Sequence, residues 1–155
     1  MSPRDTQWKP NVTVAAVIER DGRFLLVEEH TAQGIRYNQP AGHLESGESL
    51  LDAVRRETLE ETAWTFEPEA VLGIYQYAHP GDAVTYLRFA FTGRLLSQDA
   101  GRRLDDGIIR ALWMTPAEIN ACADQHRSPL LQQCVNDFLA GQRHPLNLLF
   151  HHHAS

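Results

Sequence analysis

Short apolar runs, broken by turn-forming residues, dominate the first third of the sequence. Val12–Glu19 and Arg23–His30 are rich in β-branched and other apolar residues, which is typical of strands. Between them lies Arg20-Asp21-Gly22, where the glycine can adopt the positive φ of a tight turn. The pattern therefore predicts a β-hairpin, followed after Gln33-Gly34 by a short strand at Ile35–Asn38.

The middle of the chain changes to a helical pattern at Leu50–Thr62, a stretch without Gly or Pro. Ser49 and Asp52 form an S-x-x-D pattern, in which the serine side chain caps the first turn of a helix. The apolar positions of this stretch fall on one broad face at helical spacing. We expect the residues that follow it, Trp64–Glu69, to form a loop.

The second half of the chain returns to strand patterns and ends in helices. Proline at the first helical position marks two helix starts, and a glycine marks the last helix end. The predicted elements are strands at Val71–Ala78, Ala83–Leu96 and Gly107–Met114, a helix that starts at Thr115-Pro116, and a helix between Ser128-Pro129 and Gly141. This order predicts an α/β (α+β) fold in which helices pack on a largely mixed sheet.

The composition is that of one folded domain. The chain has 155 residues, of which 43% are hydrophobic and 22% are charged, and this balance argues against wholesale disorder. We assign residues 1–150 to a single domain and residues 151–155, with His151 to His153, to a tail that is native or added. The net charge of −6 argues against a nucleic-acid partner, since nucleic-acid binders carry a basic surplus.

Neither a membrane nor a secretory route is indicated by the sequence. No apolar run approaches the ~18 residues of a spanning helix, and Met1–Asn11 lacks the apolar core of a signal peptide. Cys122 and Cys134 are twelve residues apart without a metal-ligand spacing around them. We therefore expect buried free thiols and a cytoplasmic protein without a membrane partner.

Three carboxylates crowd one side of the predicted helix. Glu57, Glu60 and Glu61 span an arc of about 100°, so their side chains converge. Like charges at these spacings repel, and the helix dipole disfavours anions near a C-terminal end. A divalent cation removes this conflict, and Mg²⁺ prefers oxygen ligands together with phosphates. The alternative is a solvated acidic face, partly neutralised by Arg55 and Arg56.

The spacing of the charged and glycine residues around this helix extends the pattern. Gly42 is followed after five residues by Glu48, after seven more by Arg56-Glu57, and then by Glu60-Glu61. This order resembles the box of the Nudix hydrolases, G-x5-E-x7-R-E-U-x-E-E-x-G-U, where U is a bulky aliphatic residue. Thr58, Ala63 and Trp64 depart from that box. If Ala63 takes the left-handed conformation of a C-cap, it costs roughly 1 kcal/mol relative to glycine.

The resemblance implies a fold and a set of roles. Nudix hydrolases are α/β/α sandwiches around a mixed β-sheet, with a catalytic loop-helix-loop that binds a divalent metal and a diphosphate. Carried over by position, Glu57, Glu60, Glu61 and the carbonyl of Ala41 are metal ligands for Mg²⁺ or Mn²⁺. Glu57 or Glu60 takes a proton from water, and Glu48 pairs with Arg56 to hold the loop on the helix.

Much of the net charge belongs to this segment. Gly42–Ala63 carries a net charge of −4, while the rest of the chain carries −2. Two bound Mg²⁺ ions would neutralise the segment and prepare it for a phosphate chain.

Further stretches resemble the NudJ-type phosphatase subgroup of this family. They are Lys9–Ala15, Tyr37–Glu45, Tyr86–Phe89, Arg127–Leu130 and Gly141–Leu146. The resemblance implies release of phosphate from nucleoside di- and triphosphates and from thiamine-type pyrophosphates. Two alternatives stay open: a hydrolase of nucleoside-diphosphate-X compounds, such as nucleotide sugars and dinucleotides, and a non-catalytic ligand-sensing Nudix domain. The chain is expected to act on a small-molecule diphosphate as a monomer or homodimer.

Candidates for substrate binding lie outside the box. Gln39 precedes it, and Arg88 alternates with apolar residues on its strand, so that Arg88 points either at a phosphate or at the surface. Asp105 and Asp106 supply an acid from a later loop or simply form a turn. Tyr77 stacks on a ring or fills the core. His43 and His79 are expected to be ordinary loop histidines.

Overall fold

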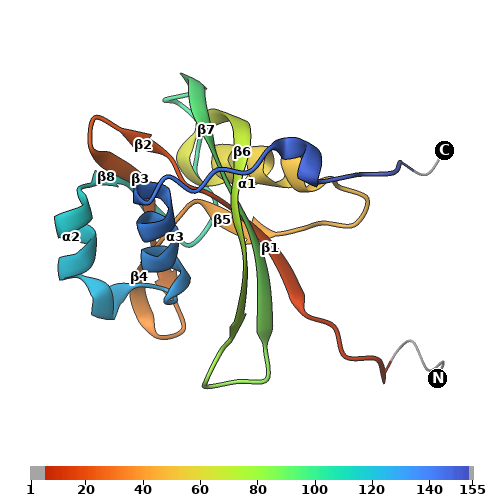
Figure 1. Cartoon of the computed structure of the whole chain (residues 1–155). Helices are drawn as coiled ribbons and strands as arrows, with labels where there is room; N and C mark the ends of the chain where they lie inside the picture. The colour runs from red at the N-terminus through yellow and green to blue at the C-terminus, as the bar shows by residue number, and fades with distance from the viewer. Residues whose placement is uncertain (1–5, 154–155) are drawn as a thin grey trace.

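The computed structural model describes residues 6–153, and it divides the strands between two sheets. The elements are β1 (Asn11–Ala16), β2 (Glu19–Arg20), β3 (Arg23–Thr31), β4 (Gly34–Asn38), β5 (Ala41–His43), α1 (Leu50–Thr62), β6 (Trp64–Ala78), β7 (Thr85–Gln98), β8 (Ile108–Met114), α2 (Pro116–Ala121), the short helix η2 (Ala123–Gln125), α3 (Leu130–Leu139) and η3 (Leu146–Leu148). Figure 1 shows α1 on one side of the strands and α2 with α3 on the other. This is the predicted α/β fold with mixed pairing.

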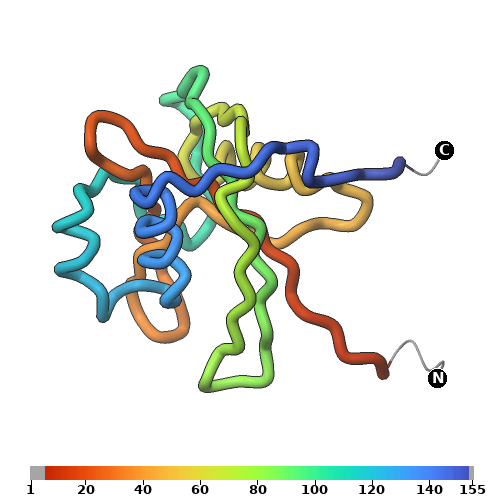
Figure 2. Tube along the Cα trace, in the orientation of Figure 1, coloured from red at the N-terminus to blue at the C-terminus, as the bar shows by residue number. Residues whose placement is uncertain are grey.

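The first sheet has the order β5-β1-β7-β6, in which β1 and β7 are parallel and the other pairs are antiparallel. The second sheet places β3 between β4 and β8, with β2 paired to the start of β3. None of the helices within residues 6–153 is long and apolar enough to cross a bilayer. Figure 2 shows the β6–β7 hairpin projecting away from the body of the molecule.

Two apolar layers cover the first sheet. One layer joins β1 and β7 to α2 and α3 through residues such as Ala15, Ala90 and Leu131. The other joins the opposite face of the same strands to α1 through Val14, Phe91 and neighbours. Successive residues of a strand point to opposite faces, so the alternation along β1 and β7 supplies both layers.

The predicted N-terminal hairpin is wrong in its pairing. Val12 to Ala16 belong to the first sheet, and only Glu19 and Arg20 pair with β3 across the turn at Asp21-Gly22. Both turn residues have positive φ, at 53° and 79°. The chain changes sheets at Val17 because the β1 strand finds a better partner, β7, from far along the sequence; apolar runs do not specify partners.

The predicted loop at Trp64–Glu69 is also wrong, since these residues begin β6. Phe66 is buried and pairs with Leu95, while Pro68 pairs with Gly93 beside a register shift. Proline is tolerated here because β6 is an edge strand of its sheet. The box loop likewise begins in a strand, as Ala41–His43 forms β5. Of the expected tail, Ala154 and Ser155 lie outside the described residues, as do Met1 to Asp5 at the other end.

Candidate active site

Helix α1 presents the carboxylates, and its two ends are defined by specific contacts. At the start, Ser49 Oγ accepts the Asp52 amide at 3.0 Å, which is the expected cap. Thr58 is fully buried, and its hydroxyl donates to the Val54 carbonyl at 2.7 Å. Thr58, which stands where the box has an aliphatic residue, therefore pairs its hydroxyl group by a hydrogen bond inside the helix.

Ala63 ends the helix in the left-handed conformation, with φ 64° and ψ 11°. This is the conformation considered for Ala63 above, because Ala63 stands where the box has a glycine. Its amide donates to the Leu59 carbonyl at 2.9 Å. The side chain is 4% exposed, so its methyl group recovers up to ~0.8 kcal/mol through burial. That gain offsets most of the ~1 kcal/mol conformational cost and explains how alanine replaces glycine here.

An acidic cluster lies beside this helix. Carboxylate oxygens of Glu57, Glu60 and Asp105 all lie within 4.8 Å of one another. The Asp105 amide donates to the Glu60 carbonyl at 3.0 Å, which brings the later turn onto α1. Burial raises the pKa of Glu60, and the neighbouring Asp105 raises it further. The structure therefore brings one of the two predicted loop acids to the helix.

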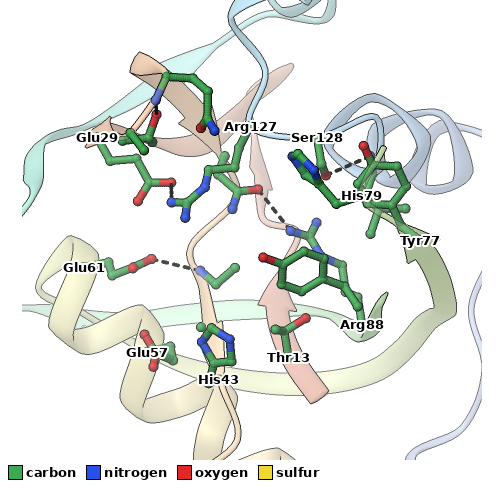
Figure 3. A pocket seen from close by; sticks show the side chains of 18 of the residues that line it. Thr13, Glu29, His43, Glu57, Glu61, Tyr77, His79, Arg88, Arg127 and Ser128 are labelled. Carbon is green, nitrogen blue, oxygen red and sulfur yellow. Dashed lines mark hydrogen bonds and ion pairs between the residues drawn. The ribbon is translucent and has the colours of Figure 1, made fainter. Parts of the chain in front are cut away.

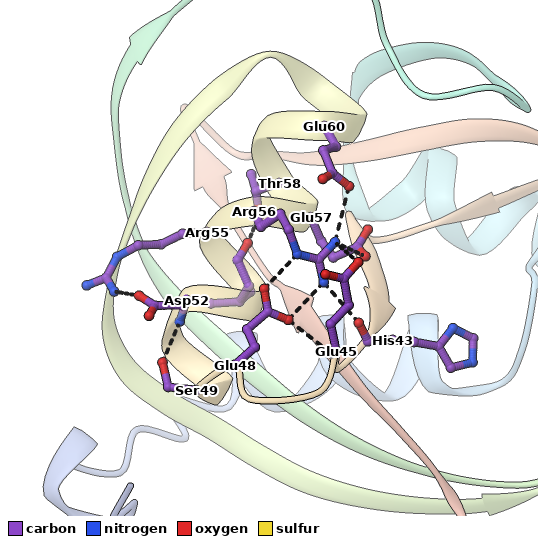
Figure 4. A network of polar contacts seen from close by, with 11 residues as sticks. His43, Glu45, Glu48, Ser49, Asp52, Arg55, Arg56, Glu57, Thr58 and Glu60 are labelled. Atoms are coloured by element: carbon purple, nitrogen blue, oxygen red, sulfur yellow. Dashed lines mark hydrogen bonds and ion pairs between the residues drawn. The ribbon is translucent and has the colours of Figure 1, made fainter. Parts of the chain in front are cut away.

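Arg56 links the loop to this cluster, as Figure 4 shows. Its Nε and Nη2 donate to both oxygens of Glu48, at 2.7 and 3.0 Å, which is the expected pair. Nη1 donates to Glu57 at 2.8 Å and to Glu60 at 3.2 Å. Nη2 also donates to the carbonyl of His43 at 3.0 Å. The hydrogen bonds from Arg56 lower the pKa of Glu48.

Glu61 turns away from this cluster toward β5. Its carboxylate accepts the Ala41 amide at 2.9 Å, and the residue is only 8% exposed. Burial raises the pKa of Glu61 to about 9 in the metal-free protein. The predicted trio thus divides, with Glu57 and Glu60 beside Asp105 and Glu61 against the strand that also carries Ala41. Here the amide of Ala41, rather than its carbonyl, contacts the glutamate.

The close approach of Glu57 to Gly42 explains why the box has a glycine at this position. A Cβ atom at this position would fall on the carboxyl group of Glu57. Glu57 is 9% exposed, and burial is the main cause that raises its pKa. The bare glycine backbone therefore makes room for a carboxylate between β5 and α1.

A cavity of about 550 Å³ opens beside Glu57 and Glu61. Figure 3 shows its walls: Glu57 and Glu61 come from α1, Thr13 and Arg88 from the first sheet, Glu29 from β3, and Arg127 and Ser128 from the segment before α3. Its lining is mostly polar and includes both acidic and basic groups. A cavity of this size accommodates a small organic ligand.

Arg88 lines this cavity and is 5% exposed, so the surface alternative for this residue is wrong. Its Nη1 donates to Gln39 Oε1 at 2.9 Å and its Nη2 to Asn38 Oδ1 at 3.0 Å. Gln39 is 1% exposed, and its Nε2 donates to the Leu131 carbonyl at 3.0 Å. The side chain of Gln39 therefore holds Arg88 in place, a role that its position in the sequence does not reveal.

The remaining predicted acid, Asp106, lies away from the cluster. Its side chain is 95% exposed and pairs with Arg103 at 3.3 Å, as in an ordinary polar turn. Asp105 and Asp106 are therefore distinguished by the fold, since only Asp105 faces α1.

Sequence reasoning missed a pair of charges in the cavity wall. Glu29 is 8% exposed and accepts a hydrogen bond from Arg127 at 2.6 Å. The two residues are 98 positions apart. Arg127 begins one of the stretches that resemble the NudJ-type subgroup, but that resemblance assigns no role to it, and Glu29 lies in none of these stretches. The expectation that His43 and His79 are loop histidines is wrong for His43, which ends β5, and both histidines line the cavity.

The donor set of the cluster fits a hard divalent cation. Mg²⁺ binds oxygen at ~2.1 Å in octahedral geometry, so ligand oxygens on neighbouring corners lie about 3.0 Å apart and those on opposite corners about 4.2 Å apart. The oxygens of Glu57, Glu60 and Asp105 lie within 4.8 Å of one another, so side-chain rotations could bring them to one ion. A bound cation would also stabilise the charged forms of Glu57, Glu60 and Glu61, whose pKa values are all raised without it.

Known proteins resemble this chain both in sequence and in structure. Residues 8–134 match the NUDIX domain family. Over 142 residues the chain is 37% identical to Phosphatase NudJ of Escherichia coli (strain K12), which covers 92% of each protein. A solved NUDIX hydrolase from Nitrosomonas europaea is 51% identical, with a TM-score of 0.93 over 95% of this chain and 100% of that one.

A more distant structure, the MutT NUDIX hydrolase from Burkholderia pseudomallei, shares the fold. It is 20% identical, with a TM-score of 0.72 over 84% of this chain and 98% of that one. The family match covers most of the chain, including every carboxylate of the box. The chain therefore belongs to the Nudix hydrolase family.

Proposed function

We propose that this protein is a metal-dependent hydrolase of small diphosphates that releases phosphate. The observation that carries the proposal is the position of Glu57, which belongs both to the acidic cluster and to the wall of the cavity. A cation held by the cluster would therefore meet a phosphate chain that enters the cavity.

The proposed substrate class is supported by the sequence resemblance and is compatible with the size of the cavity. The similarity to a phosphatase extends over 92% of both chains. We therefore infer that the substrates are nucleoside di- and triphosphates and thiamine-type pyrophosphates. The size of the cavity, about 550 Å³, suits such small molecules.

The metal ligands in this proposal are Glu57, Glu60 and Asp105, with Glu61 and the carbonyl of Ala41 on the β5 side. Mg²⁺ or Mn²⁺ bound there would neutralise phosphate charge and acidify a water molecule. Arg56 holds Glu57 and Glu60 at hydrogen-bonding distance, at 2.8 and 3.2 Å, and would keep these carboxylates next to each other where a cation could bind.

A carboxylate must accept the proton of the attacking water. Glu60 and Asp105 are the best placed, because they are adjacent and because burial, followed by repulsion from Asp105, raises the pKa of Glu60. Water attacks a phosphorus atom of the diphosphate, the bond to the bridging oxygen breaks, and the proton passes to this carboxylate pair. We further propose a cytoplasmic setting, in keeping with the free thiols of Cys122 and Cys134.

The test is phosphate release with Mg²⁺ over nucleoside di- and triphosphates, thiamine diphosphate, a nucleotide sugar and a dinucleotide. Orthophosphate from the first two groups supports the proposal, while monophosphate products from the last two favour the nucleoside-diphosphate-X alternative. Glu61→Gln should abolish turnover with the fold intact. Glu69→Gln is the control, because the Glu69 side chain is 56% exposed and pairs only with Arg94, 3.7 Å away. Undiminished turnover in Glu61→Gln contradicts the assignment.

A further inference from the structure

Arg88 is a buried cation whose contacts are all with neutral groups. Besides Gln39 and Asn38, its Nη1 contacts the Cys134 sulfur at 3.9 Å. Burial raises the pKa of Cys134, so this neighbour is a neutral thiol. Of the carboxylates in residues 6–153, none forms an ion pair with the Arg88 guanidinium.

This arrangement is costly unless an anion completes it. A buried charge needs a partner of opposite sign, and a guanidinium carries its charge at every physiological pH. Three of the five N–H donors of Arg88 are used by the contacts above, which leaves Nε–H and one hydrogen of Nη2. Two neighbouring N–H groups of one guanidinium match two oxygens of a phosphate.

The strand register places Arg88 between the metal ligands and two tyrosines. Across the first sheet, Ala15 pairs with Ala41, and Thr13 pairs with both His43 and Arg88. One repeat further along the same face, Tyr86 pairs with Tyr77. Each repeat of two residues advances about 6.6 Å along a strand. The cavity therefore runs from the carboxylates, past Arg88, to a pair of aromatic rings.

The α1 carboxylates, the Arg88 guanidinium and the two tyrosine rings all line one cavity. Glu57, Glu61, Arg88, Tyr77 and Tyr86 are among its walls. Figure 3 shows Arg88 and Tyr77 on the side of the cavity that lies across from the α1 carboxylates. A ligand with a diphosphate at one end and a planar ring at the other would contact metal, guanidinium and aromatic rings in that order.

We propose that Arg88 is a specificity-determining residue, which binds the phosphoryl group next to the organic part of the substrate. Gln39 and Asn38 are the positioning residues for its guanidinium, and Tyr77 with Tyr86 bind the planar ring. This inference rests on the proposed function and deepens it. The substrates are those of the proposed function, and inorganic pyrophosphate lacks the ring that the tyrosines would bind.

The first experiment replaces Arg88 with lysine, which keeps the charge but not the planar pair of donors. For thiamine diphosphate and ADP with Mg²⁺, the KM of Arg88→Lys rises about 10- to 100-fold while kcat changes far less, as loss of ground-state binding requires. Arg94→Lys is the matched control on the same strand, because the Arg94 side chain is 67% exposed. Its KM stays at the wild-type value.

A second readout does not depend on turnover. Calorimetry of the metal-free protein with inorganic pyrophosphate should show weaker binding to Arg88→Lys than to the wild type, by a similar factor. Equal pyrophosphate binding, or a fall in kcat at constant KM, overturns the role of Arg88. If the wild type releases no phosphate from any diphosphate, the proposed function fails. The comparison of pyrophosphate binding between the wild type and Arg88→Lys still tests whether Arg88 binds a phosphoryl group.

The ring subsite is tested separately at Tyr86. Tyr86→Leu should raise the KM for thiamine diphosphate and ADP about 5- to 100-fold, the range of one lost stacking contact. It should leave pyrophosphate binding unchanged, and Tyr86→Phe should restore the wild-type KM. Equal losses for pyrophosphate and for the ring-bearing compounds overturn the ring subsite.

Discussion

Substitution of Gly42 should impair catalysis while it leaves the fold in place. Replacing it with alanine adds one methyl group, which would fall on the carboxyl group of Glu57. The obstructing atoms are the end of a flexible side chain rather than backbone, so the carboxylate can retreat while β5 and α1 stay in place. The φ of Gly42 is not positive, and alanine is therefore conformationally allowed.

The two consequences affect different measurements. A retreat of about 1 Å or more removes a ligand from the acidic cluster, and misplacement on that scale costs about 10²-fold in rate. The fold loses the 2.8 Å charge-assisted hydrogen bond between Arg56 and Glu57, worth about 1.5–3 kcal/mol. It regains ~0.4–1 kcal/mol because alanine restricts the unfolded chain. The free energy of unfolding should therefore fall by about 0.5–2.6 kcal/mol, or about 1–10 °C in Tm.

The assay measures kcat/KM with Mg²⁺ alongside thermal unfolding in EDTA. Gly101→Ala is the control, because a Cβ there meets only Asp99 at 3.9 Å. A double-mutant cycle with Glu57→Gln gives the decisive number: if Gly42→Ala acts by displacing Glu57, the double variant is no worse than Glu57→Gln alone. Additive losses, or a Tm drop of more than ~10 °C, would refute the reasoning.

Three further predictions concern the same helix and its neighbours. Ala63→Gly should change the free energy of unfolding by less than about 0.5 kcal/mol, since the relieved left-handed strain and the lost methyl burial nearly cancel; a gain well above ~1 kcal/mol in urea denaturation contradicts this balance. In EDTA, the free energy of unfolding should fall as pH rises from about 5 to 9. Glu61 keeps its proton up to a pKa of about 9 in the folded protein but loses it near the ordinary glutamate pKa of 4.5 when the chain is unfolded. The slope contributed by Glu61 approaches 1.4 kcal/mol per pH unit, and Glu61→Gln should flatten it; a slope that is the same in both proteins shows another group to be responsible. Asp105→Asn should lower kcat/KM at least 10-fold while Asp106→Asn stays near wild type, since only Asp105 lies beside Glu60; equal effects in steady-state kinetics argue against the assignment.

The part of the site that could be predicted is the part made by one short segment. Glu57 and Glu60 converge because helical geometry relates residues three apart, and Glu48 reaches Arg56 from a loop of a few residues. The left-handed conformation of Ala63 is predictable because Ala63 stands where the box has a glycine directly after the helix, a position where glycine commonly adopts this conformation. In each case the interaction is decided within about twenty residues, so the sequence itself contains the geometry.

The part that could not be predicted depends on strand partners far apart in the chain. Arg88 reaches Gln39 across 49 positions, because β1 lies between β5 and β7. The hairpin signal at Asp21-Gly22 correctly marks a turn but says nothing about which sheet β1 joins. Asp105 and Asp106 are equivalent by sequence, and only the backbone contact to Glu60 separates them.

This division has a physical consequence for how the cavity works. The acidic end is built mainly by α1 and the loop before it, where Arg56 hydrogen-bonds to Glu48, Glu57 and Glu60. One arginine does not neutralise this end, because the pKa values of Glu57 and Glu60 stay raised. The basic end at Arg88 is held by neutral amides supplied by distant strands, and its charge has no anionic partner in the described chain. A cation completes the first end and an anion completes the second. One ligand, a metal-bound diphosphate, would supply both, and this complementarity is the strongest argument that the two ends of the cavity act as a single site.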